Sequence, residues 1–116
     1  MAEITPTLQQ KIDQRSYEYL WEQINEDDEG ASIQILPAYA DKSVHFYGTF
    51  NGGTLTLEHS MDNTNWTSAI DTGGDAIAVT AVGSVWVGTN ARYWRIANDN
   101  AGTTEDVDVY LIVGVG

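Results

Sequence analysis

At 116 residues, 42% of them hydrophobic, the chain is long enough to bury one core and is predicted to form one folded domain. It has no cysteine, which excludes a disulfide-stapled scaffold, and no apolar run near the roughly 20 residues that cross a bilayer. The formal net charge is −12 and only five residues are Lys or Arg, so no basic stripe is available for nucleic-acid phosphates. Neither a nucleic acid nor a membrane is therefore an expected partner.

Residues 1–15 are predicted to form a short N-terminal arm, either extended or helical, ahead of a domain at residues 16–116. Thr5 and Pro6 are suited to open a helix, on which Leu8 and Ile12 would share one face. Such a segment buries too little surface to fold alone, so it must pack on its own domain or on a neighbouring subunit. The arm residues expected to contact a partner are Ile4, Leu8, Ile12 and Arg15.

Residues 16–25 fit both a helical stripe and an alternating strand. Three aromatic residues within five positions, Tyr17, Tyr19 and Trp21, favour the strand. If they lie exposed, they form an aromatic stripe of the kind that marks a contact surface, so they complete the expected partner-contact set. The acidic residues 26–30 then form a loop that is too charged to bury.

Residues 43–66, SVHFYGTFNGGTLTLEHSMDNTNW, predict an antiparallel hairpin. Val44 and Phe46 alternate with His45 and Tyr47, which is the period-two pattern of a strand with one buried face. A turn cluster at residues 51–53 follows, and a second alternating run leads to Trp66.

Further short strands are predicted at residues 31–36, 66–70, 76–80, 84–88, 92–97 and 106–115. This gives eight or nine strands at intervals of roughly 8–12 residues, with no convincing helix after residue 15. The predicted fold is an all-β antiparallel sandwich, with a jelly roll as its topology. Trp66 and Trp94 are expected to fill its core.

No residue pattern predicts an enzyme, a metal or a cofactor. His45 and His59 lie on the two arms of the predicted hairpin and could approach each other, but no third zinc ligand accompanies them. The acidic residues 26–29 match no calcium-loop pattern, and Asp62 and Asn65 are better explained as turn formers. Paired carboxylates are unspecific among 17 acidic residues.

The pattern G-T-F-x-G-G-x-L-x-L-E-x-S-x-D-x-x-x-W at residues 48–66 resembles the small β-sandwich proteins that decorate the capsids of tailed double-stranded-DNA bacteriophages. The resemblance extends over residues 16–116: it includes the strand and acidic loop at 21–30, the aromatic strand at 92–96 and the alternating valines at 107–115. Similar hairpins also occur in phage tail and fibre modules and in carbohydrate-binding domains.

This resemblance implies a structural virion protein that binds the outer surface of a capsid as a decoration or cement protein, without catalysis. Its expected partners are the major capsid protein and its own copies, as a homotrimer at a threefold point of the shell. The negative charge agrees with the outer surface, because the inner surface faces packed DNA. The alternative is a carbohydrate- or receptor-binding module of a phage tail or fibre.

Overall fold

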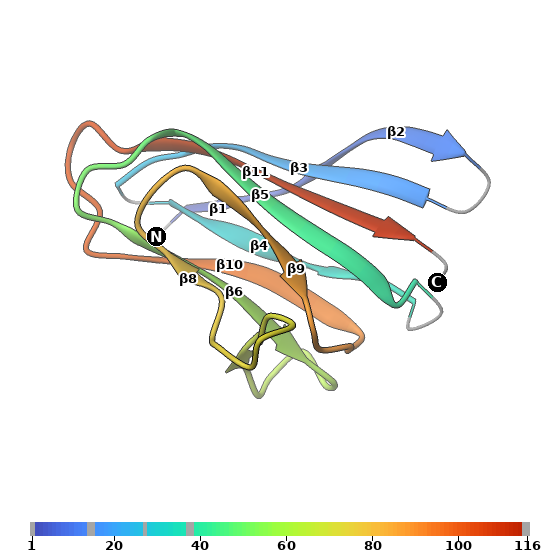
Figure 1. Ribbon diagram of the computed structural model, residues 1–116. Helices are drawn as coiled ribbons and strands as arrows, with labels where there is room; N and C mark the ends of the chain where they lie inside the picture. The colour runs from blue at the N-terminus through green and yellow to red at the C-terminus, as the bar shows by residue number, and fades with distance from the viewer. Residues whose placement is uncertain (1, 14–15, 27, 37–38, 115–116) are drawn as a thin grey trace.

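The computed structural model describes residues 2–13, 16–26, 28–36 and 39–114, and these form two β-sheets packed face to face (Figure 1). All of the regular structure in these residues is β-strand, so the predicted all-β sandwich is confirmed. Pairing is antiparallel with one exception, which involves the first strand.

Sheet A has the strand order β1-β4-β10-β6-β7, and β8 also pairs with β6. Its strands are β1 (Ala2–Ile4), β4 (Asp28–Gln34), β10 (Tyr93–Asp99), β6 (Thr54–Ser60), β7 (Thr67–Ser68) and β8 (Ala78–Val79). Sheet B has the order β2-β3-β11-β5-β9. Its strands are β2 (Thr7–Asp13), β3 (Ser16–Ile24), β11 (Asp106–Gly114), β5 (Asp41–Thr49) and β9 (Gly83–Val87).

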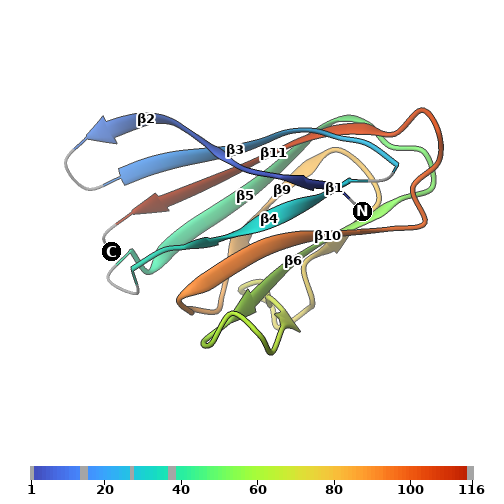
Figure 2. The ribbon, with the colours of Figure 1, turned by 180° about the vertical axis from the view of Figure 1, so that it is seen from behind.

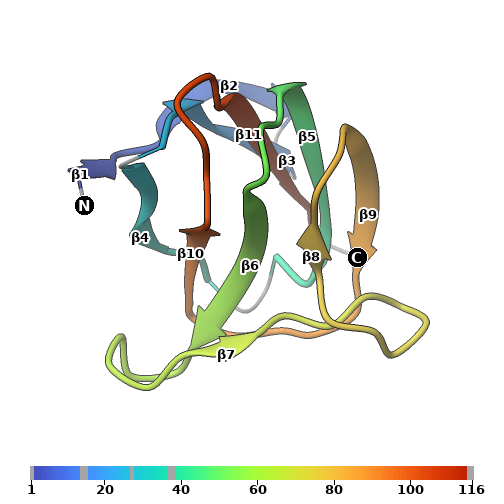
Figure 3. The same ribbon diagram turned by 90° about the vertical axis from the view of Figure 1, so that its left-hand side faces the viewer.

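The chain repeatedly changes sheet. From β3 to β6, and again from β8 to β11, each strand lies in the other sheet from the strand before it. Figure 3, which views the sandwich from one end, shows these connections running between the two layers. As a result, neighbours within a sheet are mostly distant in sequence.

The predicted hairpin at residues 43–66 is one of these crossings, so its assignment as a hairpin was wrong. Its two strands are β5 and β6, which have the expected alternation but belong to different sheets. A hairpin and a crossing between facing sheets both need two strands with one buried face and a tight turn, so the pattern fits either. Here the Glu105 carboxylate holds the corner: its Oε1 accepts the backbone N–H groups of Asn51 (2.5 Å) and Gly53 (3.3 Å).

The described N-terminal residues are extended and not helical, which is one of the two conformations expected for the arm. The strand β1 pairs in parallel with β4 on sheet A, and β2 pairs antiparallel with β3 on sheet B. Residues 2–13 therefore join both layers along one side of the sandwich, as Figure 2 shows from behind. The predicted acidic loop at 26–30 is shorter than expected, because β4 begins at Asp28.

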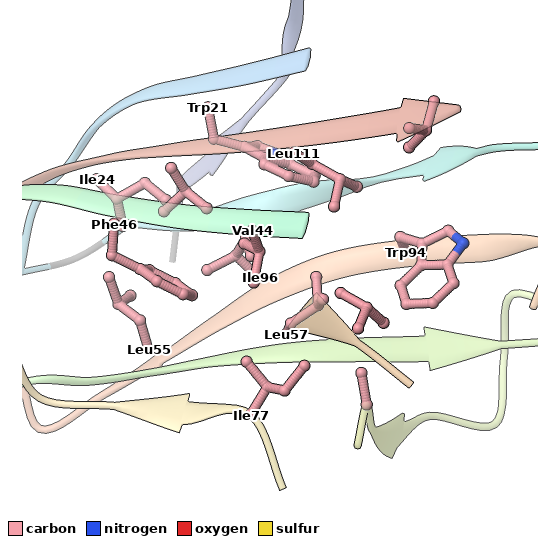
Figure 4. Close-up of a cluster of buried hydrophobic side chains, with 14 of the residues drawn as sticks. Trp21, Ile24, Val44, Phe46, Leu55, Leu57, Ile77, Trp94, Ile96 and Leu111 are labelled. Carbon is pink, nitrogen blue, oxygen red and sulfur yellow. The ribbon is translucent and has the colours of Figure 1, made fainter. Parts of the chain in front are cut away.

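The core lies between the inward faces of the two sheets (Figure 4). Sheet B contributes Trp21, Val44 and Phe46, and sheet A contributes Leu57 and Trp94, all of them fully buried. Each buried indole N–H has a partner: that of Trp21 donates to the Ala31 carbonyl and that of Trp94 to the Ala91 carbonyl, both at 3.1 Å.

The core position predicted for Trp94 is confirmed, but that of Trp66 is wrong. Trp66 is half-buried on the outer side of sheet A, where the Arg95 guanidinium lies 4.2 Å from the centroid of its ring. Arg95 also forms an ion pair with Glu58 at 2.7 Å. Trp66 precedes β7 and is not itself in a strand, so period-two alternation does not fix its side.

Candidate functional site

The outward face of sheet B carries aromatic side chains because of strict alternation along its strands. In β5, Val44 and Phe46 are fully buried, so His45 and Tyr47 must point outward. In β11 the valines face the core, and Tyr110 therefore lies on the same outer face. Tyr47 is 49% exposed, which is high for a large aromatic side chain in a strand.

The register of β3, β11 and β5 brings these residues together. Tyr110 lies opposite His45, Asp108 lies opposite Tyr47, and Ile112 lies opposite Glu18. These side chains surround a shallow depression of about 360 Å³, which we call the aromatic basin. It is lined by Glu18, His45, Tyr47, Asp108, Tyr110 and Ile112.

The rings of the aromatic basin are arranged as a small platform. The centroids of Tyr47 and Tyr110 are 5.9 Å apart with their planes at 73°, an edge-to-face contact. His45 and Tyr47 are 6.4 Å apart with planes only 14° from parallel. Such pairs hold aromatic faces in fixed orientations while leaving part of each ring open to a ligand.

The basin is acidic as well as aromatic. Glu18 and Asp108 contribute two carboxyl groups, and none of the described residues that line it is Lys or Arg. The Asp108 carboxylate is also held in place, because its Oδ1 accepts the backbone N–H of Gln23 at 2.9 Å. Gln23 has a positive φ of 54° at a register shift between β3 and β11, so Asp108 anchors an irregular point of the sheet.

A second hollow of about 280 Å³ adjoins the basin through His45 and extends the same face to β9. It is lined by Ser43, His45, Ser84, Val85 and Trp86. Trp86 is 66% exposed, the largest exposed fraction among the large hydrophobic side chains of the described residues. Exposed aromatic surface continues in this way across the sheet from β11 to its last strand.

The predicted aromatic stripe on β3 exists but faces inward. Trp21 is fully buried in the core, and Tyr17 and Tyr19 are half-buried against it. Tyr17 also makes an edge-to-face contact with Tyr39 at 5.4 Å. The expectation of an exposed stripe was therefore wrong: the pattern shows that three residues share a face but not whether that face is the inner one.

The expected contact residues of the N-terminal arm are only partly described. Ile4 is half-buried and packs against the core. Leu8 and Ile12 lie on β2, where the register places Leu8 opposite Tyr19, but their side chains are outside the described part of the structure. Arg15 lies outside the described residues altogether.

The two histidines do not approach each other. His45 lies on the outer face of sheet B, whereas His59 belongs to β6 in sheet A and sits 5.7 Å from the Trp94 ring. Burial lowers the pKa of His59. Within the described ranges, no group of three or more metal-ligating side chains is close enough to hold an ion.

Asp62 forms the turn that was predicted for it. Its carboxylate accepts the backbone N–H groups of Thr64 (2.9 Å) and Asn65 (2.8 Å), together with the side-chain amide of Asn65 (2.6 Å). These hydrogen bonds, the backbone ones first, hold the pKa of Asp62 well below its ordinary value. Asp62 is therefore a structural residue of the β6–β7 connection.

Two mainly antiparallel sheets around a single core, with an aromatic face turned outward, define a β-sandwich protein. The chain is similar in fold to the crystal structure of SPBc2 prophage-derived protein YomS, with a TM-score of 0.58, 13% sequence identity, and 90% of this chain and 98% of that chain covered. No family model matches the chain, and no curated protein matches it. At this identity the similarity concerns the fold alone. In the described residues no helix is long and apolar enough to cross a membrane.

The sequence analysis did not identify the aromatic basin, although the alternation in β5 indicated part of it. Alternation in β5 correctly placed His45 and Tyr47 on the face opposite to Val44 and Phe46. What the sequence does not show is the pairing of β11 between β3 and β5, which brings residues from about sixty to about ninety positions apart into one depression.

Proposed function

We propose that this chain is a structural virion protein of a tailed bacteriophage, which binds the outer surface of the capsid and stabilises the shell as a decoration or cement protein. The observation that carries the proposal is the outer face of sheet B, where aromatic rings are held outside the core of a small sandwich. Exposed aromatic surface of this kind is typical of protein contact sites. The fold shared with a prophage-derived protein supports a phage origin.

The strand order supports a jelly-roll topology. Sheet B contains β3-β11-β5-β9 and sheet A contains β4-β10-β6 with β7 and β8, and the chain alternates between them. Jelly rolls are built in this way from two Greek keys. A compact sandwich suits a protein whose role is to bridge shell subunits, and in the proposed role it has no enzymatic activity.

The charge supports attachment outside the shell. With a net charge of −12, the chain would be repelled by DNA packed against the inner surface. In the proposed role its partner is the major capsid protein. Many weak, repeated contacts would then stabilise the assembled shell, since a ligand that binds only the assembled state shifts the equilibrium toward it.

A stretch without charge supports self-association, which we propose occurs as a homotrimer. Residues 76–91 contain no Asp, Glu, Lys, Arg or His, although the chain carries 17 acidic residues. Val82 and Trp86 in this stretch are 56% and 66% exposed. Copies of a strongly acidic protein repel one another least where they are uncharged, so this surface is the most favourable for contact between them.

The alternative function, a carbohydrate- or receptor-binding module of a tail or fibre, is favoured by the basin itself. Its volume of about 360 Å³ accommodates a sugar ring, and the faces of Tyr47 and Tyr110 offer stacking surfaces beside carboxylate acceptors. This second candidate uses the same residues as the first, so the two must be separated by experiment.

The stoichiometry of this chain in purified virions tests the proposal directly. Hundreds of copies per particle are expected for a decoration protein, and a few copies for a tail or fibre module. In addition, purified chain should co-sediment with capsids that lack it, in a saturable manner. A low copy number together with a specific response on a glycan array would replace the first candidate with the second.

A further inference from the structure

We infer that the aromatic basin seats an arginine side chain of a partner protein. The inference rests on the proposed function in so far as that partner is the capsid protein, but the chemistry of the basin itself points to a guanidinium group. Three observations carry it: the ring platform, the two carboxylates and the absence of a cation from the described lining.

The rings provide faces on which a cation can lie. Tyr47 and Tyr110 are fixed at 73° to each other, so a group entering the basin meets the face of one ring and the edge of the other. A cation above a tyrosine face within about 6 Å of its centroid is attracted by the ring quadrupole. The same chain already uses this contact on its other sheet, where the Arg95 guanidinium lies 4.2 Å from the Trp66 centroid.

The carboxylates stand at the two ends of the platform. Asp108 is paired in register with Tyr47, and Glu18 with Ile112 at the other end of the basin. A cation over the rings is thus within the field of two negative groups, in a chain whose net charge already attracts cations. The Gln23 N–H fixes Asp108, so this carboxylate does not need to be ordered when a partner binds.

A guanidinium fits this arrangement better than an ammonium. It is planar, it stacks on aromatic faces, and its N–H groups can donate to carboxylates on more than one side at once. A neutral sugar would use the ring faces and would donate hydroxyl hydrogen bonds to the carboxylates, but it would gain no charge–charge attraction from the excess of negative charge. Charge complementarity therefore favours a basic protein segment over a glycan.

Titration of the full chain with short peptides, followed by amide and aromatic NMR shifts, tests the inference. Acetylated Gly-Arg-Gly-Arg-Gly amide should give saturable shifts at His45, Tyr47 and Tyr110, and should bind more tightly than its lysine counterpart. Chitotriose should give no saturable shift at these residues.

Two sets of variants make the test specific. The double variant Glu18→Gln, Asp108→Asn keeps acceptor atoms and shape, and should weaken arginine-peptide binding about tenfold and reduce its salt dependence. The control Asp75→Asn, Asp99→Asn changes net charge equally at two exposed carboxylates outside the basin lining and should bind like the unmodified chain. Tyr47→Phe should retain binding and Tyr47→Leu should lose it, since phenylalanine keeps the ring quadrupole.

The outcomes separate this inference from the proposed function. Absence of peptide binding, equal effects of the two double variants, or a chitotriose response that survives Glu18→Gln, Asp108→Asn would overturn the inference. If the unmodified chain binds capsids and the basin double variant binds them equally well, the decoration role stands and the arginine site does not. Arginine-specific binding by a chain that does not attach to capsids would support the site and remove the capsid as its partner.

Discussion

Lys42 and Trp94 meet across the core although their strands belong to different sheets: the ammonium nitrogen of Lys42 lies 4.8 Å from the centroid of the Trp94 ring. Lys42 is only 1% exposed, and its Nζ donates to the Tyr39 carbonyl (2.6 Å) and to Asn90 Oδ1 (3.0 Å). Burial lowers the pKa of Lys42 to about 8, against a weaker opposing effect of Asp41. A buried cation therefore ties the two layers together at one end of the sandwich.

The protein is expected to gain stability from Lys42 as the pH rises from 8 to 10. In this range the unfolded chain, whose lysine has a pKa of 10.5, binds more protons than the folded chain, and stability rises with pH wherever that holds. Above pH 10 the trend should reverse, because burial raises the pKa of Tyr19 and the folded state then holds its proton longer. Melting temperatures measured between pH 7.5 and 10 should show the rise.

The variant Lys42→Met tests the assignment, since methionine is similar in length and does not titrate. It should abolish most of the rise between pH 8 and 10. If the unmodified chain and the variant have parallel profiles, the buried ammonium is not the source of the pH dependence.

Asp62 should stabilise the protein above its ordinary pKa and cease to do so in acid. The depressed pKa means that folding stabilises the ionised form of Asp62. Its contribution to the free energy of unfolding is therefore complete above about pH 5 and is progressively lost as the pH falls below 3.8. Asp62→Ala should have a lower melting temperature than the unmodified chain at pH 7, and this difference in melting temperature should be smaller at pH 2.5. The melting temperature of Asp62→Asn, which keeps one acceptor oxygen, should lie between those of Asp62→Ala and the unmodified chain. If Asp62→Ala differs from the unmodified chain by the same amount at both pH values, the prediction is wrong.

Glu105 should be among the most sensitive polar positions of the chain. It is 2% exposed, and its Oε1 is the acceptor for two N–H groups at the corner between the sheets. Glu105→Ala removes the acceptor of the part-buried Asn51 N–H and leaves the buried N–H of Gly53 without a partner, for which we expect a loss of about 2 kcal/mol in the free energy of unfolding, measured in urea. Thr104→Ala, at the exposed neighbouring position, is the control and should change it by less than about 0.5 kcal/mol.

Gly53 should not tolerate a side chain, because it packs directly against Glu105. A Cβ added there would overlap the Glu105 carboxylate. Gly53→Ala should therefore destabilise the protein, and combining it with Glu105→Ala should cost less than the sum of the two single changes, because one change removes the group with which the other collides. Strict additivity in this double-mutant cycle would show that the two positions act independently.

Trp86 should control self-association. Trp86→Asp places a carboxylate in the uncharged stretch at residues 76–91, and we expect it to weaken association by about 2 kcal/mol, roughly thirtyfold in Kd. Sedimentation equilibrium gives the masses. Leu36→Asp introduces the same charge at a leucine that is 60% exposed outside this stretch, and should leave the assembly intact. If Trp86→Asp leaves the mass of the assembly unchanged, the contact between copies does not involve Trp86.

The sequence predicted the strands more accurately than it predicted their partners. Local alternation correctly oriented Val44 and Phe46, since each strand has a buried side and an exposed side. It could not show that β5 and β6 lie in different sheets, because a tight turn after an alternating strand is compatible with a hairpin and with a crossing. The exposed side expected for Trp21 was wrong for another reason: alternation shows which residues share a face but not which face is the inner one.

Other features depended on contacts that have no local signal. The strand Ala2–Ile4 pairs in parallel with β4, about 26 residues further along the chain. The intervening described segments are strands of the other sheet and not a helix, so no βαβ pattern announces this pairing. The close packing of Trp21 and Ile96 against Gly30 requires a glycine only because of where the other two residues lie. The candidate site was missed for the same reason, since its residues come from three strands that only tertiary pairing assembles.

The position of β11 also constrains how the protein is made. This strand is the last of the described elements in the chain, yet it lies in the middle of sheet B, hydrogen-bonded to β3 on one side and β5 on the other. While residues 106–114 are still inside the ribosome, β3 and β5 have no strand between them, and the backbone groups that would pair with β11 have no partner in the sheet. This layer can therefore be completed only after residue 114 has been synthesised. Chains truncated before that point expose an incomplete sheet that is prone to aggregation.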